Sequence, residues 1–199
     1  MRDQTKWDLI YSEKTKALSD PSEVLVDNAH LIGATGRALD LACGLGQNSL
    51  WLAQKGFVVD SWDVSEVALS KLRHACTPNL TINTKQVDIS GASLGHNTYD
   101  LIVVARYLDR NLSPAIIEAL RPNGLIFYQT FTLEKETTDG PSNPDYLLQP
   151  NELLSMFASL RVLVFKDEGL QGDYARGLRG EAYIVAKKSS EADGTLQAY

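Results

Sequence analysis

The sequence predicts an α/β fold, in which helices alternate with the strands of a mostly parallel sheet. Residues 37–63 show a βαβ unit: a short apolar strand, a glycine turn, a helix, and a second apolar strand that ends on a carboxylate. Residues 99–107 form a near-continuous apolar run, which is typical of a central parallel strand covered on both faces. With 199 residues, 44% of them hydrophobic, the chain can build one domain with a full core.

The glycine turn indicates a binding site for a nucleotide-containing cofactor. A ligand can approach the carboxyl end of a parallel strand only where no side chain stands in the way, and Gly44 and Gly46 meet that need. Asn48 or Ser49 is expected to cap the following helix, and Gly56 is expected to end it in the left-handed conformation.

The residues around this turn favour a cationic cofactor over a dinucleotide. The dinucleotide pattern G-x-G-x-x-G would need a glycine where Ser49 stands. Asp40, four positions before Gly44, would repel a pyrophosphate but would accept hydrogen bonds from an ammonium group or a water. A nicotinamide-dependent oxidoreductase therefore stays open only as the less favoured alternative.

The segment around the glycine turn resembles a known enzyme family. Residues 39–46, LDLACGLG, are similar to motif I of the class I S-adenosylmethionine-dependent methyltransferases, with Ala42 where glycine is frequent. Residues 46–53 and 63–65 are similar to the tellurite-resistance methyltransferase group and its small bacterial relatives. The resemblance covers roughly residues 5–188. It implies a Rossmann-like, seven-stranded, mostly parallel sheet with helices on both faces and the last strand antiparallel.

The cofactor implied by the resemblance is S-adenosyl-L-methionine. Asp63 would accept from both ribose hydroxyls, Asp88 would meet the adenine amino group, and Asp40 would reach the methionine part. Val64 and Ile89 would hold the base between them. The residues expected to contact the cofactor are Trp7, Asp40, Ala42, Gly44, Gly46, Asn48, Asp63, Val64, Asp88, Ile89 and Ala105.

The implied reaction is displacement at the methyl carbon, with S-adenosylhomocysteine leaving. Because the reagent is already activated, the enzyme mainly aligns the partners and excludes water, so no catalytic residue is assigned. A small-molecule acceptor is expected: a chalcogen oxyanion, a thiol or a small metabolite. A noncatalytic module that binds S-adenosylmethionine or S-adenosylhomocysteine as a regulator would share the cofactor motifs and stays open.

The first 35 residues are expected to form a helical segment over the cofactor site, as the resemblance implies. Pro21 starts a helix that runs to about Leu31. Trp7 and Tyr11, one helical turn apart, either face the sulfonium cation or simply pack on the domain. Residues 36–188 would then be the methyltransferase core, and residues 189–199 are expected to form a flexible tail.

Further elements follow from capping signals and apolar patterns. The predicted helices begin near Ser65, Ser113 and Asn151. The turn at residues 121–124, R-P-N-G, is expected to end the second of these helices. The remaining predicted strands are residues 80–87, 125–131, 161–165 and 182–186.

Candidate acceptor contacts lie at the end of the central strand and in a long polar stretch. Arg106 and Tyr107 follow that strand, although Arg106 would also suit a surface pair with Asp109 or Glu118. Residues 133–150 are too polar and punctuated for a regular element, and a loop of this length is usually functional. We interpret it as a substrate lid. The candidate acceptor contacts are Tyr11, Arg106, Tyr107 and Tyr146.

Composition narrows the choice of partners. The net charge is −6 and no cluster of lysine or arginine occurs, so no nucleic-acid partner is expected. No apolar run reaches membrane-spanning length and no signal-peptide core is present, which favours a cytoplasmic protein without membrane contact. The two cysteines and three histidines show no metal spacing, so no metal is expected. The sequence leaves monomer and homodimer equally open.

Overall fold

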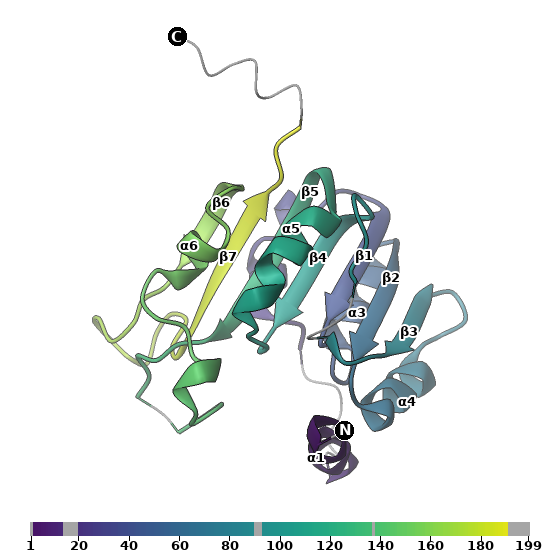
Figure 1. Ribbon diagram of the computed structural model, residues 1–199, viewed down its shortest axis with the longest axis horizontal. Helices are drawn as coiled ribbons and strands as arrows, with labels where there is room; N and C mark the ends of the chain where they lie inside the picture. Colours follow the sequence, from purple (N-terminus) through teal and green to yellow (C-terminus); the bar gives the residue numbers. More distant parts are fainter. Residues whose placement is uncertain (1, 14–19, 90–92, 137, 191–199) are drawn as a thin grey trace.

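A computed structural model describes residues 2–13, 20–89, 93–136 and 138–190 of the chain. Within these residues seven strands form one sheet in the order β3-β2-β1-β4-β5-β7-β6. β7 is antiparallel to both of its neighbours, and all pairs among the first five strands are parallel, as predicted (Figure 1). Most of the predicted tail, residues 191–199, lies outside the described residues.

The elements have the following bounds. The strands are β1 Gly36–Leu41, β2 Phe57–Asp63, β3 Ile82–Gln86, β4 Tyr99–Ala105, β5 Leu120–Phe131, β6 Arg161–Lys166 and β7 Glu181–Lys187. The α-helices are α1 Arg2–Glu13, α2 Glu23–Asp27, α3 Gln47–Gln54, α4 Glu66–Ala75, α5 Ser113–Ala119 and α6 Glu152–Met156. Short 3-10 helices cover Ala29–Leu31, Arg110–Leu112 and Pro144–Tyr146.

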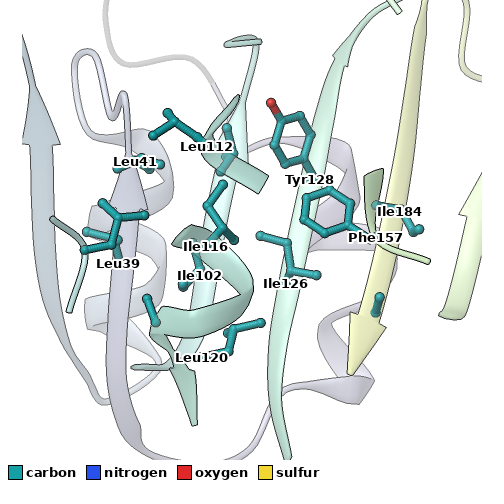
Figure 2. Close-up of a cluster of buried hydrophobic side chains, with 14 of the residues drawn as sticks. Leu39, Leu41, Ile102, Leu112, Ile116, Leu120, Ile126, Tyr128, Phe157 and Ile184 are labelled. Carbon is teal, nitrogen blue, oxygen red and sulfur yellow. The ribbon is translucent and has the colours of Figure 1, made fainter. Parts of the chain in front are cut away.

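Apolar side chains bury both faces of the sheet. On one face, Ile116 of α5 and Phe157, which follows α6, pack against every second residue of the strands, for example Ile102 (Figure 2). On the other face, Leu25 of α2 and Leu52 of α3 pack against the intervening strand residues. Burial on both faces explains why the central strands are apolar almost throughout.

Three local predictions differ from the structure. α2 spans only Glu23–Asp27, and a 3-10 turn follows it in place of one continuous helix to about Leu31. α3 begins after Gly46, because Asn48 and Ser49 lie inside the helix and hydrogen-bond elsewhere instead of capping it. α5 ends at Ala119, so residues 121–124 form an irregularity inside β5 and do not end the helix.

The carboxyl ends of β1 to β4 lie at one edge of the sheet. α1 lies beyond the arrowheads of β1 and β2 at this edge, beside α4 (Figure 1). In the part of the chain that the structure describes, no helix is both long and apolar enough to cross a membrane. Parallel α/β sheets bind ligands at the carboxyl edge, so a functional site is expected there.

Candidate functional site

The loop after β1 turns sharply because three of its residues adopt left-handed backbone conformations. Ala42, Gly44 and Gly46 have φ values of 57°, 54° and 82°. Glycine adopts this conformation freely, whereas the Cβ of Ala42 makes it cost on the order of 1 kcal/mol. A side chain on Gly46 would also overlap Leu72 of α4, so the loop lies directly against the core. Because the loop packs closely against α4, its backbone lies at the carboxyl edge of the sheet.

Asp63, the last residue of β2, holds this loop in place. One of its carboxylate oxygens accepts a hydrogen bond from the Gly44 N–H at 2.8 Å, and the other accepts one from the Ser65 N–H at 2.8 Å. Burial raises the pKa of Asp63, and the backbone donors oppose that shift. Each carboxylate oxygen can accept a further hydrogen bond, so the side chain can hold the loop and bind a hydroxyl group together.

Asp40 is a buried carboxylate with spare hydrogen-bonding capacity. Its Oδ2 accepts from the Ser49 hydroxyl at 2.6 Å, and the Ser61 hydroxyl donates to Ser49 at 2.7 Å. Its Oδ1 is buried and has no hydrogen-bond partner among the residues that the structure describes. Burial raises the pKa of Asp40 to about 7, the hydrogen bond from Ser49 opposes the shift, and the charge of Asp63 adds to it. A buried carboxylate with one oxygen still able to accept fits an ammonium group or a bound water and disfavours a pyrophosphate.

This buried acid makes stability depend on pH. The pKa of Asp40 is raised from 3.8 to about 7, so folding favours the protonated form. We therefore expect the ligand-free protein to lose stability as the pH rises from about 4 through about 7, by at most about 4 kcal/mol. Urea unfolding at several pH values measures the change, and Asp40→Asn should flatten it. An equally steep loss in Asp40→Asn would contradict the assignment.

The helix α1 is fastened to the start of α4. The Asp8 carboxylate accepts from the Ser65 hydroxyl at 2.5 Å and from the Val67 N–H at 3.3 Å, next to the positive end of the α4 dipole. The Lys71 ammonium donates to the Tyr11 carbonyl oxygen at 2.6 Å. These contacts hold the N-terminal segment at the carboxyl edge of the sheet.

The aromatic pair of α1 lies at the loop after β1. Trp7 and Tyr11 stack with their ring centroids 5.7 Å apart. A Cβ added to Gly44 would lie 2.8 Å from the Tyr11 hydroxyl oxygen, so this hydroxyl fills the approach to Gly44. Burial, reinforced by the charge of Asp63, raises the pKa of the Tyr11 phenol. The structure thus places the Tyr11 hydroxyl at Gly44, one of the predicted cofactor residues.

The residues predicted to bind adenine follow β2 and β3. Val64 is half-buried just after β2, and its carbonyl oxygen accepts from the Gln86 side chain at 3.2 Å. Asp88 is exposed two residues beyond β3, whereas Ile89 is buried in the core cluster that also holds Ile102. Because β2 and β3 are neighbours, these residues lie at the same edge as Asp63.

Cys43 lies between Ala42 and Gly44 in this loop, but its thiol is buried. Its side chain is buried, and burial raises the pKa of the thiol well above its ordinary value. A thiol that is protonated and inaccessible is a poor nucleophile. Cys43 therefore belongs to the packing of the loop.

A cavity opens at the same edge of the sheet, at the ends of β4 and β5. Its volume is about 360 Å³, and its charged lining residues are Arg106, Lys135, Asp139, Arg179 and Glu181. Arg106 has a left-handed φ of 57°, and its Nε donates to Glu181 Oε1 at 2.8 Å. Asp109 and Glu118, the alternative partners that the sequence suggests, do not pair with Arg106.

Sequence reasoning found only part of this cavity. Lys135 and Asp139 come from the long polar loop, but Tyr146 of that loop is half exposed and is not among the lining residues. Tyr107 is half-buried, and its carbonyl oxygen accepts from the Tyr128 hydroxyl at 2.9 Å. The sequence does not predict Glu181 as a site residue, because its contact with Arg106 exists only once β7 has paired with β5.

Comparison with known proteins gives consistent matches. Residues 4–168 match the family model described as the tellurite resistance protein TehB. The probable S-adenosyl-L-methionine-dependent methyltransferase TehB of Haemophilus influenzae is 31% identical over 150 residues, which cover 72% of this chain and 52% of that protein. The crystal structure of TehB from Haemophilus influenzae superposes with a TM-score of 0.68 and 27% identity, covering 92% of this chain and 67% of that chain. The putative methyltransferase YqeM of Bacillus subtilis is 30% identical over 102 residues, 47% of this chain and 41% of that protein. The chain spans about half the length of these curated relatives.

Proposed function

This chain belongs to the TehB tellurite resistance family, and on that premise we propose that it transfers the methyl group of S-adenosylmethionine to a small anionic acceptor. The acceptor cavity would be the one that Arg106, Lys135 and Arg179 line, because these three cationic side chains outnumber its two carboxylates and favour an anion. A chalcogen oxyanion is the first candidate, since the matching family is named for tellurite resistance. A small thiol or carboxylate metabolite is the second.

The residues at the loop after β1 suit the cofactor. The unpartnered Oδ1 of Asp40 would receive the ammonium group, directly or through a water, and Gly44 would let the ligand approach the backbone. Asp63 would accept from the ribose hydroxyls with the lone pairs that its two backbone donors leave unused. Because Tyr11 fills the approach to Gly44, its side chain would have to move when the cofactor binds.

The cofactor supplies an activated methyl group, so the chain need supply only alignment and protection from water. An acceptor lone pair attacks the methyl carbon as the carbon–sulfur bond breaks, and the bonding pair stays on sulfur. The cationic cavity would hold the acceptor in line, and the long polar loop, through Lys135, would help to close it. An anionic acceptor carries no proton that must be removed, so for it no proton transfer by a side chain is needed in this step.

Two measurements test the proposed function. We expect calorimetry to show micromolar binding of S-adenosylhomocysteine and no uptake of NADH, because the buried carboxylate of Asp40 opposes a pyrophosphate. We also expect release of S-adenosylhomocysteine from S-adenosylmethionine in the presence of tellurite, selenite or a small thiol. Binding without turnover on any acceptor would favour a regulatory module, and uptake of NADH alone would favour an oxidoreductase.

A further inference from the structure

Arg106 occupies a backbone conformation that its own side chain disfavours. Its φ of 57° costs an arginine on the order of 1–3 kcal/mol, whereas glycine would adopt it freely. The Arg106 N–H donates to the Gln129 carbonyl oxygen at 2.8 Å, which fixes this turn to the end of β5. The strained turn delivers the guanidinium group to the mouth of the acceptor cavity.

A series of buried hydrogen bonds connects the guanidinium group of Arg106 to the core. Glu181 Oε1 accepts from Arg106 Nε at 2.8 Å, and Glu181 Oε2 accepts from Gln129 Nε2 at 2.6 Å. Gln129 Oε1 in turn accepts from the Val24 N–H of α2 at 2.8 Å. The side chain of Glu181 is 9% exposed and that of Arg106 is 62% exposed, so this series of hydrogen bonds runs from the core to the cavity. Both carboxylate oxygens of Glu181 are therefore held.

The contact through Nε leaves the outer end of the arginine available. Among the residues that the structure describes, neither Nη group of Arg106 makes a hydrogen bond. Two parallel N–H donors on a planar guanidinium match two oxygens that share one central atom. The other two cations of the cavity are occupied differently: Lys135 donates to carbonyl oxygens of its own loop, and Arg179 donates to carbonyl oxygens of residues 169–176.

We propose that Glu181 and Gln129 are positioning residues that orient Arg106 to grip two oxygens of the acceptor through its Nη groups. This inference rests on the proposed function and narrows its acceptor to a small oxyanion or carboxylate. The cavity is lined by three cationic side chains and two carboxylates, Asp139 and Glu181, so a singly charged anion balances it. A neutral thiol would leave the Nη donors unused.

The test compares Glu181→Gln with the wild-type protein. Tellurite and benzoate serve as the oxyanion and carboxylate probes, and calorimetry measures their binding with and without S-adenosylhomocysteine. We expect Glu181→Gln to weaken binding of the preferred probe about tenfold, because a neutral amide holds Nε less firmly than a carboxylate does. The KM for that acceptor should rise by the same factor, with kcat within about threefold and S-adenosylhomocysteine binding unchanged.

Two further variants separate positioning from stability. Arg106→Lys, which lacks the planar fork, should match or exceed the effect of Glu181→Gln, and the double variant should be no worse than Arg106→Lys alone. The control is Glu152→Gln, which disturbs a similar pair outside the cavity, where Arg110 Nε donates to Glu152 at 2.5 Å. It should leave probe binding unchanged.

Three results would overturn the inference: probe binding by Glu181→Gln within twofold of wild type, an equal effect of Glu152→Gln, or no binding of either probe to the wild-type protein. Failure of the proposed function is seen separately, because S-adenosylhomocysteine itself would then not bind.

Discussion

Replacing Asp63 with alanine is expected to weaken binding of S-adenosylhomocysteine by about two to four orders of magnitude. Hydrogen bonds between a carboxylate and the two ribose hydroxyls are each worth about 1.5–3 kcal/mol, and both would be lost. Asp63 also holds the Gly44 and Ser65 N–H groups, so the loop that receives the cofactor would lose its anchor. Calorimetric titration measures the dissociation constant directly.

Two asparagine variants sharpen this result. Asp63→Asn keeps one oxygen acceptor and should fall between wild type and Asp63→Ala. Asp60→Asn is the matched control, because Asp60 is also a buried carboxylate of β2 but bonds to Arg37, Asn83 and Tyr99 away from the loop. Asp60→Asn should lower stability while the folded protein keeps its affinity. Equal losses of affinity in Asp63→Asn and Asp60→Asn would show that Asp63 acts only through folding.

Gly46→Ala is expected to lower the free energy of unfolding by about 2–5 kcal/mol. A left-handed φ of 82° is unfavourable for alanine, and the new Cβ would overlap the buried Leu72 side chain. Leu72 of α4 is fully buried in a cluster with Cys43 and Leu50, so it cannot move aside without disturbing that cluster. Urea denaturation of the purified variant measures the loss.

Gly172→Ala isolates the backbone part of this cost. Gly172 has a similar φ of 77°, but an added Cβ would meet nothing within 4 Å. We expect this variant to lose about 1 kcal/mol, the strain of the left-handed conformation alone. If the two alanine variants were equally stable, the proposed overlap with Leu72 would be wrong.

Much of the fold was readable from local sequence. The strand from Phe57 to Asp63, the Ser65 cap of α4 and the left-handed Gly56 are confirmed, because each depends on residues close in the chain. The helix ends were less predictable. Asn48 looks like a cap in sequence, but its side-chain oxygen accepts from the Ser22 N–H and hydroxyl, 26 residues away.

The meeting of Asp40 and Asp63 at one edge of the sheet was also predictable. The ends of parallel strands meet at one edge, so Asp40 and Asp63 had to lie near the same loop. The position of Tyr11 was not predictable, because it depends on how Asp8 and Lys71 fasten α1 to α4. Such contacts are made by polar surface residues, which do not recur at a regular spacing in the sequence and so cannot be predicted from it.

The sequence by itself determined the fold class, the loop after β1 and the family, because apolar periodicity and glycine spacing are local signals. Only the tertiary structure decided the surroundings of Arg106. Its partner Glu181 lies 75 residues further on, and β7 brings it there by inserting between β5 and β6. A hydrogen bond between side chains that distant leaves no trace in local pattern, since its geometry exists only once the strands have paired.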